Sequence, residues 1–289
     1  MYEEAFIIKT LFISDLDGTL LNSSAEVSGY TADTINRLAE QGVSFTYATA
    51  RTAYTAERIT ARLNINVPCI LNNGAEIYDR QSGEYVRKVC IPRDKADRLI
   101  SAFEENEVGF QMFKFVGGRL VMLHTPYLNE LMRGNIANRR ATTDQTIIEC
   151  GDMHAENDGG IVYFATTGDC VTLLPVREAA VGMEDISHEF YVDTYTGKHY
   201  LEIFSCDASK ANGIRFLREK YGFERVVAFG DNLNDIPMFE QADLRIAVGN
   251  ANEQVKAAAD IVIDTNDSDG AAKWLASNYN KYIFDERNT

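Results

Sequence analysis

At the start of the chain, hydrophobic and polar positions form a pattern of alternating strands and helices. The apolar run Leu11–Ile13 predicts a buried strand, and Thr31–Gln41 places Ile35, Leu38 and Ala39 at helical spacing. The pattern then predicts a strand over Val43–Ala48, a helix from about Tyr54 to Leu63, and a strand over Pro68–Leu71. Strands that alternate with helices favour a doubly wound parallel sheet, so we expect an α/β core.

The pattern changes after Ala75. The pattern predicts strands over Glu76–Tyr78, Glu84–Val89, Phe110–Val116, Arg119–Leu123, Ile161–Ala165 and Glu189–Val192, and helices over Arg93–Asn106, Tyr127–Asn138 and Pro175–Val181. Glycine-containing loops join two pairs of these strands as hairpins. Hairpins with helices between them favour an α+β domain, which we place at 80–192. The polar stretch 141–160 has no assignable pattern.

The alternation of strands and helices returns near Tyr200. The predicted elements are strands over Tyr200–Phe204, Val226–Phe229, Leu244–Val248 and Ile261–Ile263, and helices over Ser209–Tyr221, Leu233–Gln241, Asn252–Ala259 and about Ser268–Tyr279. The sequence therefore predicts a discontinuous core domain, 1–79 with 193–289, interrupted by the domain at 80–192.

Charge narrows the choice of partners. The 28 basic and 43 acidic residues give a net charge of −15, which argues against nonspecific binding to nucleic acid or to an anionic membrane. The five cysteines have no CxxC spacing, so neither a disulfide framework nor a zinc site is indicated. The acidic start Met1–Glu4 does not resemble a signal peptide, and we expect a cytoplasmic protein. The oligomeric state is left open.

Candidate chemistry begins directly after the first strand. Asp15 and Asp17 lie two residues apart, so they point to the same side if the strand geometry persists. Gly18 then allows the backbone to turn sharply. Carboxyl ends of strands are where open α/β sheets bind their ligands. The simpler alternative is an acidic turn after a core strand.

Polar residues also follow other predicted core strands. Thr49 ends the second strand, Lys210 begins the helix after Tyr200–Phe204, and the acidic segment Gly230–Asp235 follows Val226–Phe229. Taken singly, these features suit a helix cap, a solvated lysine and acids that favour a helix N-terminus. Together they fall at one edge of the predicted sheet, and this favours a common site.

These segments resemble a known family. Ser14–Leu20 (SDLDGTL), Tyr47–Arg51 (YATAR), Ala208–Ile214 (ASKANGI) and Gly230–Asp235 (GDNLND) resemble motifs I to IV of the haloacid dehalogenase (HAD) superfamily. Leu71–Ala75 (LNNGA) is similar to a run in its Cof-like subfamily, in which an α+β cap of type C2B is inserted between motifs II and III. Ala211 departs from the glycine that many members carry there.

The resemblance implies a role for each matching residue. Asp15 would be the nucleophile that forms an aspartyl-phosphate, and Asp17 the general acid. Mg²⁺ would be held by Asp15, Asp231 and the main-chain carbonyl of Asp17. The phosphoryl group would be bound by Lys210, Thr49 and Asn234, and Asp235 would orient a metal-bound water or Lys210.

Two points remain open at the edge of these motifs. Arg51 either approaches the substrate or pairs with an acid. Asn73 and Gly74 either line the site or serve only the turn.

The resemblance leads us to expect a Mg²⁺-dependent phosphatase that hydrolyses small phosphate monoesters, such as sugar phosphates or phosphorylated cofactors. The domain at 80–192 would set its specificity. Alternatives are a phosphomutase of related architecture, a narrow sugar-phosphate phosphatase similar to the sucrose-phosphate type, and a noncatalytic phosphometabolite-sensing regulator. A dehalogenase is the weakest, because Asp17, Gly18 and Asp231 are what the phosphatase branch needs.

Overall fold

The computed structural model describes residues 8–192 and 196–284. The acidic N-terminal residues that argue against a signal peptide, and residue 193 at the predicted domain limit, lie outside the described residues. The chain divides into two compact units, a core unit (Met1–Val86 with Ser209–Thr289) and an inserted unit (Arg87–Ala208).

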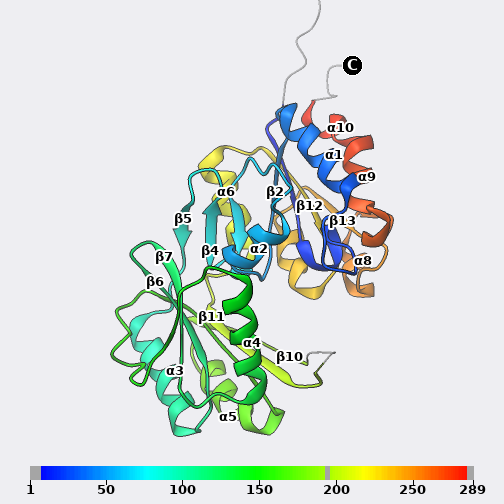
Figure 1. Cartoon of the computed structure of the whole chain (residues 1–289). Helices are drawn as coiled ribbons and strands as arrows, with labels where there is room; N and C mark the ends of the chain where they lie inside the picture. Colours follow the sequence, from blue (N-terminus) through cyan, green and yellow to red (C-terminus); the bar gives the residue numbers. More distant parts are fainter. Residues whose placement is uncertain (1–7, 193–195, 285–289) are drawn as a thin grey trace, which may run out of the picture. The chain divides into compact units, whose positions relative to one another are not determined.

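Strands and helices alternate through most of the core unit, as the sequence pattern predicts (Figure 1). Its elements are β1 (Thr10–Ser14), α1 (Gly29–Glu40), β2 (Ser44–Tyr47), α2 (Ala53–Ile59), β3 (Cys69–Leu71), β4 (Glu76–Asp79), β5 (Glu84–Lys88), α6 (Lys210–Tyr221), β12 (Arg225–Gly230), α7 (Ile236–Glu240), β13 (Leu244–Ala247), α8 (Glu253–Ala258), β14 (Ile261–Val262), α9 (Gly270–Asn278) and α10 (Asn280–Ile283). Strand β5 extends two residues past Val86 into the inserted unit.

The central sheet of the core unit is parallel. Its five strands run in the order β14-β13-β12-β1-β2. A parallel bridge between Ala48 and Ile70 connects the end of β2 to β3, which continues antiparallel into β4 and then β5. The predicted doubly wound α/β core is therefore confirmed, with β1 lying between β12 and β2.

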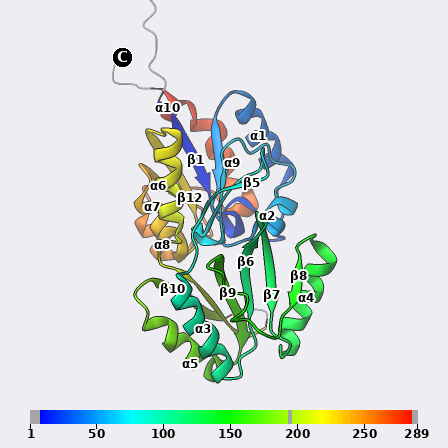
Figure 2. The ribbon, with the colours of Figure 1, turned by 90° about the vertical axis from the view of Figure 1, so that its left-hand side faces the viewer.

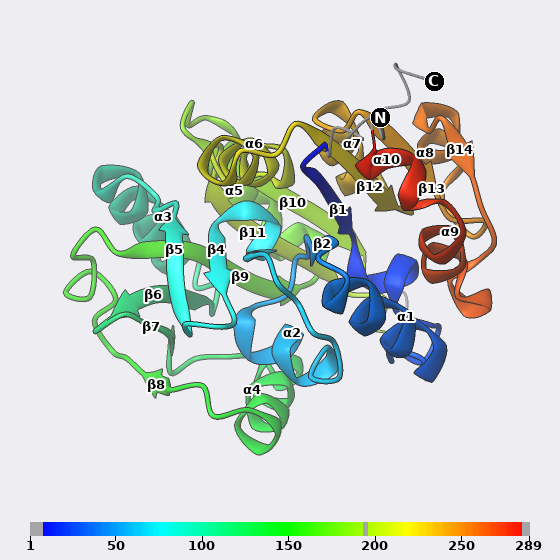
Figure 3. The same cartoon turned by 90° about the horizontal axis from the view of Figure 1, so that it is seen from above.

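Both faces of this sheet are covered by helices (Figures 2 and 3). Along β1, Phe12 packs into a cluster with residues of α1 and α9, whereas Leu11 and Ile13 pack into a cluster with residues of α6, α7 and α8. A strand that is buried on both faces needs apolar side chains at successive positions. This explains why the segment that ends at Asp15 is a continuous apolar run.

The inserted unit has a mainly antiparallel sheet. Its elements are α3 (Arg93–Glu105), β6 (Gln111–Val116), β7 (Arg119–His124), α4 (Glu130–Thr142), β8 (Ile147–Glu149), β9 (Ile161–Gly168), α5 (Cys170–Val181), β10 (Ile186–Val192) and β11 (His199–Ser205). The strand order is β10-β11-β9-β6-β7-β8. Leu99 and Phe103 of α3 and Leu173 of α5 pack with Phe164 of β9 in one apolar cluster, as expected for an α+β unit.

No helix among the described residues is both long and apolar enough to span a membrane.

Two sequence-based assignments differ from the structure. The strand predicted over Tyr200–Phe204 was placed in the core domain, but β11 pairs with β9 and β10 in the sheet of the inserted unit. The units accordingly divide after Val86 and Ala208, rather than after residues 79 and 192. The unassigned stretch 141–160 contains the end of α4 and the short strand β8, which runs parallel to β7.

Gly74 marks a close approach of two segments of the core unit. It has φ +99°, and a Cβ atom built there would lie 2.1 Å from the carbonyl oxygen of Ser209. Gly42 has φ +83° but nothing within 4 Å of such a Cβ atom. The two glycines therefore share a left-handed backbone and differ in the space around them.

We predict that Gly74→Ala lowers the free energy of unfolding by about 3 kcal/mol and Gly42→Ala by only about 1 kcal/mol. Both variants strain the backbone, but the first also forces a collision with main-chain atoms. Urea denaturation of the two variants measures the difference. Equal losses would contradict the close packing of Gly74 against Ser209.

Candidate active site

Asp15 is placed by β1, an interior strand of the core sheet. It directly follows β1, its main-chain N–H donates to the Phe229 carbonyl of β12 at 2.9 Å, and only 6% of the residue is exposed. The next residues, Leu16–Leu20, form a tight turn that Asp17 and Gly18 interrupt with non-helical backbone angles. Gly18 has φ +83°, and a Cβ atom there would lie 2.4 Å from Asp231 Oδ2. Glycine is therefore needed where the turn meets Asp231.

Lys210 joins two carboxylates at the start of α6. Its Nζ lies 2.5 Å from Asp15 Oδ1 and 2.7 Å from Asp235 Oδ1, and all three residues are buried. The side chain of Ser209 caps this helix by accepting from the Asn212 N–H. A buried ammonium needs such ionic partners, because burial without them is strongly unfavourable.

Asp235 extends this network to the segment after β12. Its Oδ2 accepts the main-chain N–H groups of Asp231 and Asn232 at 2.9 and 3.0 Å. Thr19, from the turn after β1, donates its hydroxyl to Asp231 Oδ1 at 2.6 Å. The structure thus brings together Asp15, Lys210, Asp231 and Asp235, as the sequence predicts, and adds Thr19.

The charges of this cluster are strongly coupled. Burial raises the pKa of Asp15, the Lys210 ammonium lowers it, and the carboxylates of Asp235 and Asp231 raise it again, with a net rise. Burial opposes the charge of Lys210, but Asp15 and Asp235 outweigh it and raise the pKa of Lys210. Burial also raises the pKa of Asp231 to about 6, although the hydrogen bond from Thr19 opposes this. Lys210 therefore does not fully compensate the negative charge of the carboxylates in this cluster.

Three carboxylates of this cluster have the donor set of a metal site. Oxygen atoms of Asp15, Asp231 and Asp235 all lie within 4.8 Å of one another. With Lys210, they leave an excess of two negative charges when ionised, which matches a hard divalent cation. Asp235 already accepts three N–H bonds, so its contacts favour orientation of its neighbours over metal binding. The Asp17 side chain is not in this group, and the role of its carbonyl stays a prediction.

Asp17 is held by Arg51. The Arg51 Nε and an Nη atom donate to the two carboxylate oxygens of Asp17 at 2.8 and 2.6 Å. These hydrogen bonds raise the pKa of Arg51. Of the two roles considered for Arg51, the structure shows pairing with an acid.

Thr49 and Asn234 lie at the same edge of the core sheet. Thr49 follows β2, is 1% exposed, and accepts the Arg51 N–H at 3.2 Å through its hydroxyl. Thr52, not Thr49, is the residue that precedes α2, so the helix-cap alternative for Thr49 is wrong. Asn234 is partly buried in the turn Leu233–Asp235. Their contacts with phosphate stay predictions.

Sequence reasoning missed three residues in and around the Asp17–Gly18 turn, namely Thr19, Asn250 and Asn266. Asn250 donates from Nδ2 to the Gly18 carbonyl at 2.7 Å, and its Oδ1 accepts the Asn266 N–H at 2.9 Å. Thr19 was within a quoted motif but had no role assigned to it. The asparagines are more than 230 positions from the turn, and no local pattern indicates that contact.

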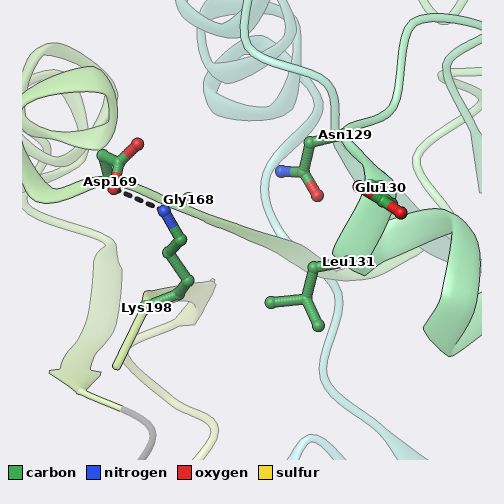
Figure 4. A pocket seen from close by; sticks show the side chains of 6 residues that line it. All are labelled: Asn129, Glu130, Leu131, Gly168, Asp169 and Lys198. Carbon is green, nitrogen blue, oxygen red and sulfur yellow. Dashed lines mark hydrogen bonds and ion pairs between the residues drawn. The ribbon is translucent and has the colours of Figure 1, made fainter. Parts of the chain in front are cut away.

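A separate hollow lies in the inserted unit, at the starts of α4 and α5 (Figure 4). Its lining consists of Asn129, Glu130, Leu131, Gly168, Asp169 and Lys198. Lys198 Nζ pairs with Asp169 Oδ1 at 2.7 Å. Because the basic side chain among these six is paired and Glu130 adds negative charge, the hollow is poorly suited to a phosphate anion.

The family follows from a match over most of the chain. Residues 12–275 match the model of the haloacid dehalogenase-like hydrolases. The chain belongs to this family, and the resemblance seen in its motifs is confirmed.

Several curated relatives of the chain are phosphatases. A 5-amino-6-(5-phospho-D-ribitylamino)uracil phosphatase of Bacillus subtilis is 27% identical over 92% of this chain and 96% of its own length. A pyridoxal phosphate phosphatase of Escherichia coli is 28% identical over 91% of this chain and 96% of its own length. These relatives support a phosphatase activity for the chain.

Solved structures agree with the fold. A haloacid dehalogenase-like hydrolase from Bacteroides thetaiotaomicron has a TM-score of 0.76 at 27% identity and covers 93% of this chain and 98% of its own. A protein from Thermotoga maritima has the same TM-score and identity, with coverages of 94% and 97%. The core with an inserted unit is therefore the architecture of known HAD-like hydrolases.

The raised pKa of Asp231 predicts a pH-dependent stability in metal-free buffer. Because its pKa is higher in the folded state than in the unfolded state, the folded protein binds the proton more tightly. The stabilisation is present below about pH 4 and is lost as the pH rises to about 6. Asp231→Asn keeps an acceptor for Thr19 and removes this loss. From pH 4 to 7 its unfolding free energy should gain on that of the wild type by up to about 3 kcal/mol.

Urea denaturation in EDTA at several pH values measures this gain. Parallel curves for the two proteins would show that Asp231 does not titrate as its burial indicates.

Proposed function

We propose that the chain is a Mg²⁺-dependent phosphatase that hydrolyses small phosphate monoesters, either sugar phosphates or phosphorylated cofactors, through an aspartyl-phosphate on Asp15. The observation that carries the proposal is the buried cluster in which Lys210 links Asp15 to Asp235, with Asp231 beside them. The substrates named for the curated relatives, a phosphorylated ribitylaminouracil and pyridoxal phosphate, support this class of substrate.

In the first step, a carboxylate oxygen of Asp15 attacks phosphorus and the bond from phosphorus to the ester oxygen breaks. Asp17 donates a proton to the leaving oxygen, so that the product departs as an alcohol. In the pairing observed, Asp17 accepts two hydrogen bonds from Arg51. The acid role therefore requires Asp17 to take up a proton and to loosen its contact with Arg51.

In the second step, water attacks phosphorus of the aspartyl-phosphate. Asp17 takes a proton from this water, inorganic phosphate leaves, and the Asp15 carboxylate is restored. Lys210 is held rigidly by Asp15 and Asp235, so its charge is oriented before substrate arrives. Such preorganised charge lowers the barrier when negative charge shifts onto phosphoryl oxygens.

Phosphate binding is assigned to Lys210, Thr49 and Asn234, and metal binding to Asp15, Asp231 and the carbonyl of Asp17. A bound Mg²⁺ would supply positive charge that lets the anionic carboxylate meet the anionic phosphoryl group. Asp235 acts through its neighbours, because its oxygens hold Lys210 and the main chain of Asp231 and Asn232.

We predict that Asp15→Asn lowers phosphate release from a panel of sugar phosphates and phosphorylated cofactors at least about a thousandfold, because the nucleophile is lost. Phosphate release with Mg²⁺ and the circular dichroism spectrum are measured together. The matched control is Asp260→Asn, which removes an acid that pairs with Arg245 on the surface and should leave turnover unchanged.

Full activity of Asp15→Asn would remove Asp15 as the nucleophile. Phosphorus NMR of the products separates hydrolysis from a mutase, since a mutase returns the phosphoryl group to a sugar hydroxyl. A wild type that releases no phosphate from any compound would favour a sensor.

EDTA should abolish hydrolysis, and excess Mg²⁺ should restore it, because the acidic cluster cannot admit a phosphate dianion without added positive charge. Initial rates before and after Mg²⁺ addition measure this, with Mg²⁺-saturated EDTA as the control. Undiminished hydrolysis in EDTA would contradict the proposed ligand set.

A further inference from the structure

The turn Asn72–Asn73–Gly74 has an unusual backbone. Its three residues have φ values of +46°, +52° and +99°, in the left-handed region that non-glycine residues rarely adopt. The turn is held against the end of β2, because Asn72 N–H donates to the Arg51 carbonyl at 3.1 Å and Asn73 N–H donates to the Thr49 carbonyl at 3.0 Å. The strained turn is therefore fastened to the segment that carries Thr49.

The two asparagine side chains differ in their partners. Asn72 donates from Nδ2 to Glu76 Oε1 at 2.7 Å, which gives this amide a structural role. Asn73 is only 5% exposed, and within residues 8–192 and 196–284 neither its Oδ1 nor its Nδ2 has a hydrogen-bond partner. A buried amide without partners is destabilising, and such groups are retained where a function uses them.

Asn73 lies between two segments assigned to phosphate binding. On one side, its main chain is bonded to Thr49. On the other, the following residue, Gly74, packs so closely on the main chain of Ser209 that it leaves no room for a Cβ atom. Ser209 immediately precedes Lys210. The main chain that carries the unpartnered amide is thus fixed between Thr49 and the residue before Lys210.

We propose that Asn73 is a further phosphate-binding residue, whose side-chain Nδ2 donates a hydrogen bond to an oxygen of the bound phosphoryl group. This inference rests on the proposed function. A phosphate dianion offers only acceptor oxygens, so it calls for donors. In a site crowded with carboxylates, a neutral amide supplies a donor to that anion.

The test compares Asn73→Gly with Asn72→Gly. Glycine accepts the left-handed backbone at both positions, so each variant removes an amide without adding strain. The measurements are the dissociation constant for inorganic phosphate by calorimetry in Mg²⁺, and the melting temperature. Asn73→Gly should weaken phosphate binding about tenfold to a hundredfold, as for loss of a hydrogen bond to a charged group, with an unchanged or raised melting temperature.

Asn72→Gly should do the reverse. It removes a partner of Glu76, so the melting temperature should fall while phosphate affinity stays within about twofold of the wild type. A second variant, Asn73→Asp, has nearly the same shape and tolerates a left-handed backbone, and its added charge should weaken phosphate binding further. If Asn73→Gly does not fold, Asn73→Asp takes its place in the measurement of phosphate binding.

Wild-type phosphate affinity in Asn73→Gly or Asn73→Asp would overturn the inference, as would a wild type that binds no phosphate. Failure of the proposed function gives a different result. If the wild type hydrolyses no ester but binds phosphate in an Asn73-dependent way, the inference stands and the phosphatase proposal falls. If the wild type hydrolyses esters but its affinity for phosphate does not change when Asn73 is replaced, the phosphatase proposal stands and the inference falls.

Discussion

The arrangement of the site depends on one buried ammonium group. Lys210 bonds to Asp15 from the end of β1 and to Asp235 from the turn after β12, and Asp235 in turn holds the main chain of Asp231. Three segments that are distant in sequence are thus drawn together by ionic contacts in a buried setting. Removing the lysine would leave buried carboxylates without compensation, which is far more costly than loss of a surface ion pair. The ammonium group that bonds to these carboxylates is also the one proposed to bind the phosphoryl oxygens.

Local patterns predicted the core well because its strands are buried on both faces. The apolar run before Asp15, the helical spacing of Ile35 and Leu38, and the glycine and acids after β12 are all signals carried by neighbouring residues. The error at β11 has a physical cause. A short apolar strand looks the same whichever sheet it joins, and only its pairing with β9 and β10 assigns it to the inserted unit. Lys210 was placed correctly although the strand before it was not, because α6 packs beside β3 of the core unit.

Contacts of the site were less predictable than its residues. The motifs located Asp15, Asp17, Lys210 and Asp231, but the pairing of Asp17 with Arg51 was one of two open alternatives, and the support of Gly18 by Asn250 had no sequence signal. Side-chain partners depend on how distant segments meet, and a single sequence does not record this. The unpartnered amide of Asn73 belongs to the same category, since its burial appears only when β2, β3 and α6 are assembled.

The boundary between the two units falls at Ala208 and Ser209, immediately before Lys210. Ser209 caps α6 and also packs on Gly74. This boundary residue therefore helps to hold the start of α6, where Lys210 lies. This limits how the inserted unit could be exchanged during evolution. Recombination that exchanged the inserted unit as a whole would have to rejoin the chain before Ser209 to keep these contacts. Evolution by domain exchange is therefore confined to splice points that leave this short junction intact.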